Sequence, residues 1–141
     1  MTPIEQIIAE RAEAMRLKDA ERVVATYAPE VVIFDLAPPL SRAGAEVTSP
    51  DGIRAWFDGF AGPLGYDVTD LVVTAGADVA FCHSLNRLAA TPHGFPEGFE
   101  MWFRATTGLR VVDGEWKITH EHTSTPFYMD GSFRAATDLR P

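Results

Sequence analysis

The chain has 141 residues, the length of one typical domain, and its 46% hydrophobic and 23% charged residues are those of a globular protein. A formal net charge of −8 without a cluster of Lys and Arg argues against nucleic acid as a partner, because binding to phosphate backbones needs clustered cations. No apolar stretch approaches about 18 residues and no signal peptide is recognisable, so we expect a cytoplasmic protein without membrane contact. The lone cysteine, Cys82, cannot form an intrachain disulfide and is expected to be buried.

The first part of the chain predicts helices. Apolar residues recur at steps of three and four between Ile4 and Met15, with Glu and Arg between them. Thr2, Pro3 and Glu5 supply the capping-box pattern that begins such a helix. Similar patterns, each with a capping residue, follow later. We therefore predict helices over residues 3–15, 18–28 and 51–60, and a strand over residues 30–36.

Beyond residue 60 the hydrophobic period changes from helical to two residues, which is the period of half-buried strands. Four strands are predicted, at residues 66–75, 79–90, 99–112 and 115–127. Asp113 and Gly114 are the strongest hairpin-turn signal. Helices followed by a meander of strands indicate a single α+β domain over residues 1–141, with helices on one sheet face and a polar tail at the end.

A histidine pair marks the last predicted strand, where WKITHEHTSTPF places His120 and His122 one residue apart. Alternate residues of a strand share a face, so both should point to the same side as Ile118 unless a β-bulge reverses the assignment. Three interpretations stay open: a catalytic or ligand-binding role in a pocket, hydrogen bonding that orders the tail, and a metal site completed by His83 or Asp35. No second Cys or His motif supports the metal site, so we expect no metal.

Asp35 is the second chemical feature, because it follows two candidate inward residues, Val31 and Ile33, at the end of the first predicted strand. A carboxylate in an apolar pocket is basic enough to take a proton from a carbon next to a carbonyl group. The alternative is a turn or helix-capping carboxylate ahead of Pro38.

Further side chains are candidates for a pocket lining. Arg104, which alternates with Trp102, could hold a substrate carboxylate by a two-pronged hydrogen bond, or form a cross-strand salt bridge on an exposed sheet surface. His83 sits among apolar neighbours on its strand and is expected to point inward. The expected ligand-binding residues are Tyr27, Trp56, His83, Trp102, Arg104 and Ser124.

The element order, together with the segments DVAFCHSLNRL and MWFRATTGLRVVDGEWKITHEHTSTPF, resembles the NTF2-like superfamily. More closely, it is similar to SnoaL-like and ketosteroid-isomerase-like proteins, over nearly the whole chain. The resemblance implies a cone-shaped NTF2-like barrel, in which three N-terminal helices wrap a curved, mainly antiparallel sheet around a deep pocket. It also implies a homodimer formed through the outer sheet face.

In ketosteroid isomerases a carboxylate at the end of the first strand is the proton-shuttling base, and Asp35 matches that position. The first-helix tyrosine that donates to the oxyanion has no clear counterpart near Met15, so the donor is expected among His120, His122, Tyr27 and Trp102. The resemblance thus implies cofactor-independent acid–base chemistry on a small apolar carbonyl compound, by isomerisation, cyclisation or dehydration. Asp35 would be the base, with His120 and His122 as acid or oxyanion donors. The alternative is a non-catalytic ligand-binding or dimeric association module of the same fold.

Overall fold

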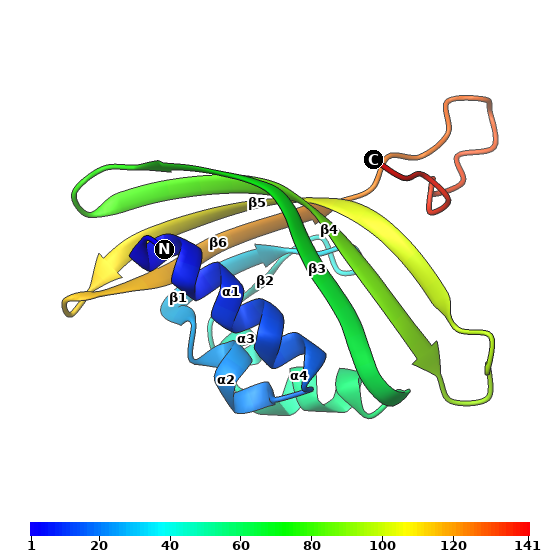
Figure 1. The fold of residues 1–141 in the computed structure, drawn as a ribbon, viewed down its shortest axis with the longest axis horizontal. Coiled ribbons are helices and arrows are strands. Elements are labelled where there is room, and N and C mark those ends of the chain that lie inside the picture. Colours follow the sequence, from blue (N-terminus) through cyan, green and yellow to red (C-terminus); the bar gives the residue numbers. More distant parts are fainter.

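The computed structural model describes residues 1–141, and its helices lie against one face of a curved sheet (Figure 1). The sheet has six strands in the order β2-β1-β6-β5-β4-β3; β1 runs parallel to β6 and every other pair is antiparallel. This confirms the predicted α+β fold with a mainly antiparallel sheet, which stays open between its edges β2 and β3. The elements in chain order are α1 (Pro3–Arg16), α2 (Ala20–Val24), β1 (Tyr27–Phe34), β2 (Arg42–Ala43), α3 (Ala45–Thr48), α4 (Pro50–Phe57), β3 (Phe60–Ala75), β4 (Val79–Pro92), β5 (Phe99–Val112) and β6 (Glu115–Ser124).

The structure differs from the predicted elements mainly between residues 18 and 66. The helix predicted over residues 18–28 ends at Val24, because Tyr27 already pairs with Ile118 of β6. Two short elements, β2 and α3, were not predicted, and β3 begins at Phe60 rather than at residue 66. Both short elements follow the proline-rich loop after β1, where sequence periodicity is too brief to detect.

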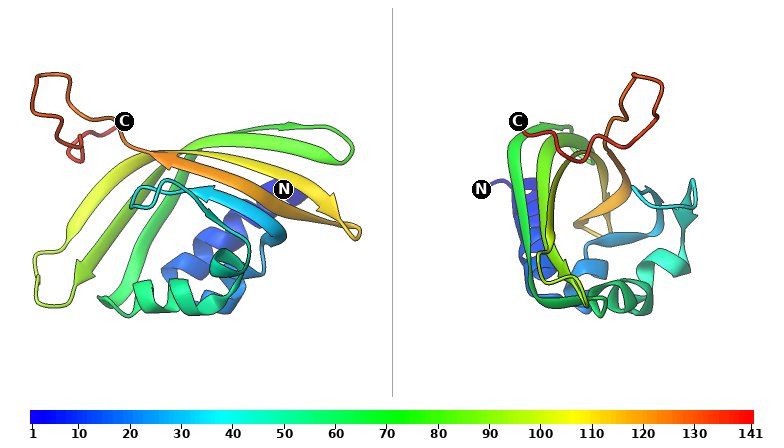
Figure 2. Two further views of the ribbon diagram at one scale, coloured as in Figure 1. Left: turned by 180° about the vertical axis from the view of Figure 1, so that it is seen from behind. Right: turned by 90° about the vertical axis from the view of Figure 1, so that its right-hand side faces the viewer.

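Helix α1 packs across the concave face of the sheet, which the two views of Figure 2 show at right angles to each other. Its capping box is formed, since the Thr2 side chain accepts from the Glu5 N–H and the Glu5 carboxylate accepts from the Thr2 N–H. Ile4 and Ile8 pack against buried residues of β1, β4, β5 and β6, including Cys82. A second cluster joins the end of α1 to α2, α4 and the opposite end of the sheet, with Ala14, Val23, Phe57, Leu64, Leu88 and Phe103 among its members.

A β-bulge in β6 decides which of its side chains face the core. In the β5–β6 ladder Leu109 pairs with Ile118 and Gly108 pairs with His120, so Thr119 is an extra, bulged residue. The β5–β6 turn forms as predicted, with positive φ angles at Asp113 (52°) and Gly114 (82°).

Beyond β6 the chain leaves the sheet as an irregular loop, visible in red and orange in Figure 1. Phe127 bridges to Ala135 within this loop, while Phe127, Met129 and Phe133 expose much of their apolar surface. No helix of the structure is long and apolar enough to cross a membrane.

Candidate active site

A cavity of about 480 Å³ lies between the concave face of the sheet, α1, α4 and the loop after β1. Fourteen of its 21 lining residues are hydrophobic, so it suits a largely apolar ligand of drug-like size. Aromatic side chains gather on its α4 side, where the Trp56 and Phe60 rings meet edge to face with centroids 5.0 Å apart. Trp56 therefore lies in the wall of the cavity, as predicted.

The cavity also has a polar side, formed by a buried ion pair between Arg11 of α1 and Glu121 of β6. Their side chains are only 6% and 10% exposed. Thr107 also donates to the Glu121 carboxylate, with 3.1 Å between the two oxygens. One guanidinium nitrogen of Arg11, Nη1, is buried without any hydrogen-bond partner. We call this part of the cavity, where Arg11 and Glu121 meet, the floor.

The charge state of Arg11 follows from its neighbours. Burial alone lowers the pKa of its guanidinium, but the carboxylate of Glu121 and the phenol rings of Tyr27 and Tyr66 together raise that pKa well above its ordinary value. Arg11 is therefore a permanent cation beside the cavity. Its guanidinium carbon lies 5.9 Å from the centroid of the Tyr27 ring, which is within cation–π range.

Two tyrosines, the buried Tyr66 and the half-buried Tyr27, flank this cation and line the cavity. Desolvation raises the pKa of the Tyr27 phenol, and it raises that of Tyr66 to about 12. Both phenols therefore keep their protons at neutral pH and can act as hydrogen-bond donors. The Tyr66 oxygen accepts from Asn86 Nδ2 at 3.3 Å, and Ser84 in turn donates to Asn86 Oδ1 at 2.7 Å. This chain of contacts fixes the position of the Tyr66 hydroxyl.

Asp35 lies where the sequence predicted it, in the cavity wall directly after β1. Its Oδ1 accepts from the Leu36 N–H at 2.8 Å and from the Thr123 hydroxyl at 3.4 Å. It forms no ion pair, and it is exposed rather than buried. Asp35 is thus a free carboxylate at the side of an apolar cavity.

The prediction that His120 and His122 point into the pocket is wrong. The bulge at Thr119 interrupts the alternation of β6, so Ile118, Glu121 and Thr123 face inward while both histidines face outward. On the outer face the Phe34 ring contacts them edge to face, with centroid distances of 4.8 Å to His120 and 5.4 Å to His122. His120 Nδ1 also lies 2.6 Å from the carbonyl oxygen of Val32, which matches the open interpretation of histidines hydrogen-bonded to a neighbouring strand.

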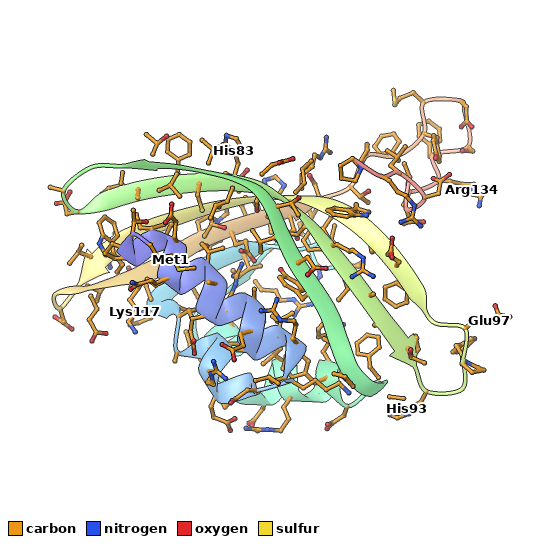
Figure 3. The ribbon with its side chains drawn as sticks, viewed as in Figure 1. Met1, His83, His93, Glu97, Lys117 and Arg134 are labelled. Atoms are coloured by element: carbon orange, nitrogen blue, oxygen red, sulfur yellow. The ribbon has the colours of Figure 1, made fainter.

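Four other predicted ligand-binding residues also lie outside the cavity. The inward residues of β4 are Ala80, Cys82, Ser84, Asn86 and Leu88, so His83 points away from the helices (Figure 3). Trp102 and Arg104 flank the buried Phe103 and therefore face outward, and Arg104 donates to Ser124 across the strands at 3.2 Å. Arg104 is thus on an exposed sheet surface, one of the two predicted alternatives, although its partner is a hydroxyl rather than a carboxylate. Of the predicted set, only Tyr27 and Trp56 line the cavity, together with the candidate base Asp35.

Sequence reasoning missed the polar side of the cavity. Arg11 occupies a position of the apolar series Ile4, Ile8, Arg11, Met15, and a charge on the buried face of a helix is a detectable signal. Glu121 carries no such signal, because its inward direction depends on the bulge. No group of three or more His, Cys, Asp or Glu side chains is arranged to hold a metal ion.

The chain is similar in sequence to one protein family and in fold to several solved structures. The sequence model of the SnoaL-like domain family matches residues 4–128 of this chain. An NTF2-like protein of unknown function from Pseudomonas putida KT2440 is 32% identical, with a TM-score of 0.84 over 98% of this chain and 94% of that one. A provisionally assigned scytalone dehydratase from Novosphingobium aromaticivorans is 15% identical, with a TM-score of 0.78 over 96% and 89% of the two chains. A ketosteroid isomerase-like protein from Erwinia carotovora atroseptica is 21% identical, with a TM-score of 0.67 over 86% and 92%. No curated protein sequence matches the chain.

Proposed function

Because the chain belongs to the SnoaL-like domain family, we propose that it is an enzyme that carries out cofactor-independent acid–base chemistry on a small, largely apolar carbonyl compound. The observation that carries the proposal is Asp35, a carboxylate without a cationic partner in the wall of a mainly apolar cavity. A carboxylate that is free of ion pairs is available to take a proton from a bound ligand.

In the proposed reaction the Asp35 carboxylate takes a proton from a carbon next to the ligand's carbonyl group. The electron pair of that C–H bond moves into the new C=C bond, and the carbonyl oxygen becomes an enolate oxygen. Neutral phenols at the floor, Tyr27 and Tyr66, support this oxygen by hydrogen bonding. Return of the proton to a different carbon is an isomerisation; expulsion of hydroxide from the adjacent carbon, protonated to water, is a dehydration.

Structural neighbours are consistent with this class of reaction. Those described as dehydratases and as ketosteroid isomerase-like share the fold at 15 to 21% identity. At that identity they support the fold alone, so the choice between isomerisation, cyclisation and dehydration depends on the ligand. The homodimer and the cytoplasmic location expected from the sequence stay proposals.

Proton exchange tests the proposal without a known substrate. 1-Tetralone is a flat ketone with exchangeable protons on C2, and in D₂O their replacement by deuterium is followed by NMR. We expect the wild-type protein to accelerate this exchange, and Asp35→Asn to lower the catalysed rate about 100-fold or more, because a positioned general base contributes that much. Asp78→Asn is the matched control, since Asp78 is an exposed carboxylate in the β3–β4 turn without an ion pair.

Exchange at the buffer rate in the wild-type protein, or equal rates in wild type and Asp35→Asn, would overturn the assignment of Asp35 as the base. Ligand binding without exchange would favour the non-catalytic binding module.

A further inference from the structure

The guanidinium of Arg11 has a hydrogen-bond donor that is buried and unpaired. Arg11 Nη2 reaches Glu121, while Nη1 of the same guanidinium is the one buried side-chain nitrogen or oxygen atom without a partner. Leaving a buried donor unpaired is costly, and the cost is higher for a charged group. Arg11 lines the cavity, although Nη1 itself has almost no surface open to it, so a small rotation of the guanidinium would present Nη1 to an acceptor oxygen of a ligand.

From this geometry we infer that the cavity floor binds an oxygen atom of an uncharged ligand, such as a ketone, quinone or lactone carbonyl, through Arg11 Nη1. This binding role does not depend on catalysis at Asp35. It requires that an acceptor oxygen of the ligand reach the floor and that the Arg11 guanidinium turn toward it.

The charges around the cavity indicate why the ligand is uncharged. The Glu121 carboxylate already balances the Arg11 cation at the floor. Asp35 and Glu46 add two more carboxylates to the lining, against one further cation, Arg42. A carboxylate ligand would therefore meet three acidic side chains and two basic ones, whereas a neutral carbonyl oxygen gains a charge-assisted hydrogen bond without adding negative charge.

The apolar part of the lining sets the remaining properties of the ligand. A volume of about 480 Å³ with Trp56 and Phe60 along one side suits a compact ring system. The ligand class is therefore a flat, uncharged, oxygen-bearing ring compound.

Three bicyclic probes of similar size test this assignment: 1-tetralone, which has a ketone oxygen; tetralin, which has none; and tetralin-1-carboxylate, which is anionic. Their dissociation constants are measured by titration calorimetry at pH 7. We expect wild-type protein to bind 1-tetralone about 10- to 100-fold more tightly than tetralin, as a hydrogen bond to a charged donor provides, and the carboxylate no more tightly than tetralin.

Arg11→Lys keeps a cation opposite Glu121 but replaces the forked guanidinium with a single nitrogen, so the preference for 1-tetralone should fall below about threefold. Arg11→Met/Glu121→Met removes the donor and its partner together and should likewise reduce the preference below about threefold, leaving what the Tyr27 and Tyr66 hydroxyls provide, while tetralin still binds. Arg22→Lys, which changes an arginine paired with Glu10 and Glu13 outside the cavity, is the control and should leave all three constants unchanged. Circular dichroism of each variant verifies the fold.

Four results would each overturn the assignment: equal binding of 1-tetralone and tetralin, tightest binding of the carboxylate, a ketone preference that persists in both Arg11 variants, and failure of all probes to bind at millimolar concentration. Asp35→Asn separates this inference from the proposed enzymatic function. If the oxygen site is correct, Asp35→Asn retains the ketone preference whether or not the wild-type protein catalyses exchange.

Discussion

Breaking the buried pair of Arg11 and Glu121 should have a large and asymmetric effect on stability. Glu121→Met leaves the Arg11 cation, whose side chain is 6% exposed, without its carboxylate. Removing one partner of a buried pair costs about 3–5 kcal/mol of unfolding free energy, because the remaining charge is uncompensated. Arg11→Met should cost less, since the Glu121 carboxylate keeps its hydrogen bond from Thr107, whereas the guanidinium left by Glu121→Met loses its one side-chain partner.

The double variant Arg11→Met/Glu121→Met removes both charges and replaces them with apolar side chains. Such replacements are often neutral or stabilising, so its unfolding free energy should lie within about 1 kcal/mol of wild type or above it. The sum of the two single effects should therefore exceed the double effect by several kcal/mol, which is the signature of direct coupling.

Urea unfolding at pH 7, followed by circular dichroism and tryptophan fluorescence, measures all four proteins. Single effects below about 1 kcal/mol that simply add in the double variant would refute the argument, because they would show that the two side chains neither pair nor lose their hydration.

Three further predictions follow from the positions of side chains. The double variant His120→Ala/His122→Ala should bind 1-tetralone within about twofold of wild type, because both rings lie on the outer face; a tenfold loss by calorimetry would contradict that placement. Unfolded tyrosine loses its proton near pH 10 and Tyr66 near about 12, so the folded state holds more protons in this interval and stability falls as pH rises through it. In urea unfolding, the decrease in unfolding free energy across this pH interval should be up to about 2.7 kcal/mol larger for wild type than for Tyr66→Phe. Identical pH profiles of the two proteins would show that Tyr66 is not desolvated. Phe81 is 50% exposed on the outer sheet face, so Phe81→Glu should convert the expected homodimer to a monomer in sedimentation velocity, and a monomeric wild type would refute the dimer itself.

The fold could be predicted from the sequence because its signals are long and regular. A capped amphipathic helix and long strands with a two-residue period specify the layers, and the turn at Asp113 and Gly114 specifies one hairpin. Asp35 could be predicted for the same reason, since residues 31–34 just before it alternate regularly between buried and more exposed positions. Short elements such as β2, whose two residues offer no periodicity, were not detectable.

The polar side of the cavity was not predicted, because one extra residue in β6 reverses which of its side chains point toward the core. With Thr119 bulged, Ile118 and His120 lie on opposite faces although they are two positions apart. The bulge turns the conspicuous histidines outward and the inconspicuous Glu121 inward. The residue at position 119 does not indicate a bulge, because threonine is common in regular strands. The buried arginine of α1 was the available clue, since a cation on an apolar helix face requires a partner inside the fold.

Strand β6 links the two chemical parts of the cavity. It contributes Thr123, which donates to Asp35, and Glu121, which holds Arg11, and these two inward residues are two positions apart. Through these two contacts the candidate base and the candidate oxygen-binding group are both tied to the same strand. An apolar ring in the cavity would displace water from the exposed Asp35 carboxylate, and desolvated carboxylates are stronger bases. The ligand itself would therefore complete the environment in which Asp35 acts.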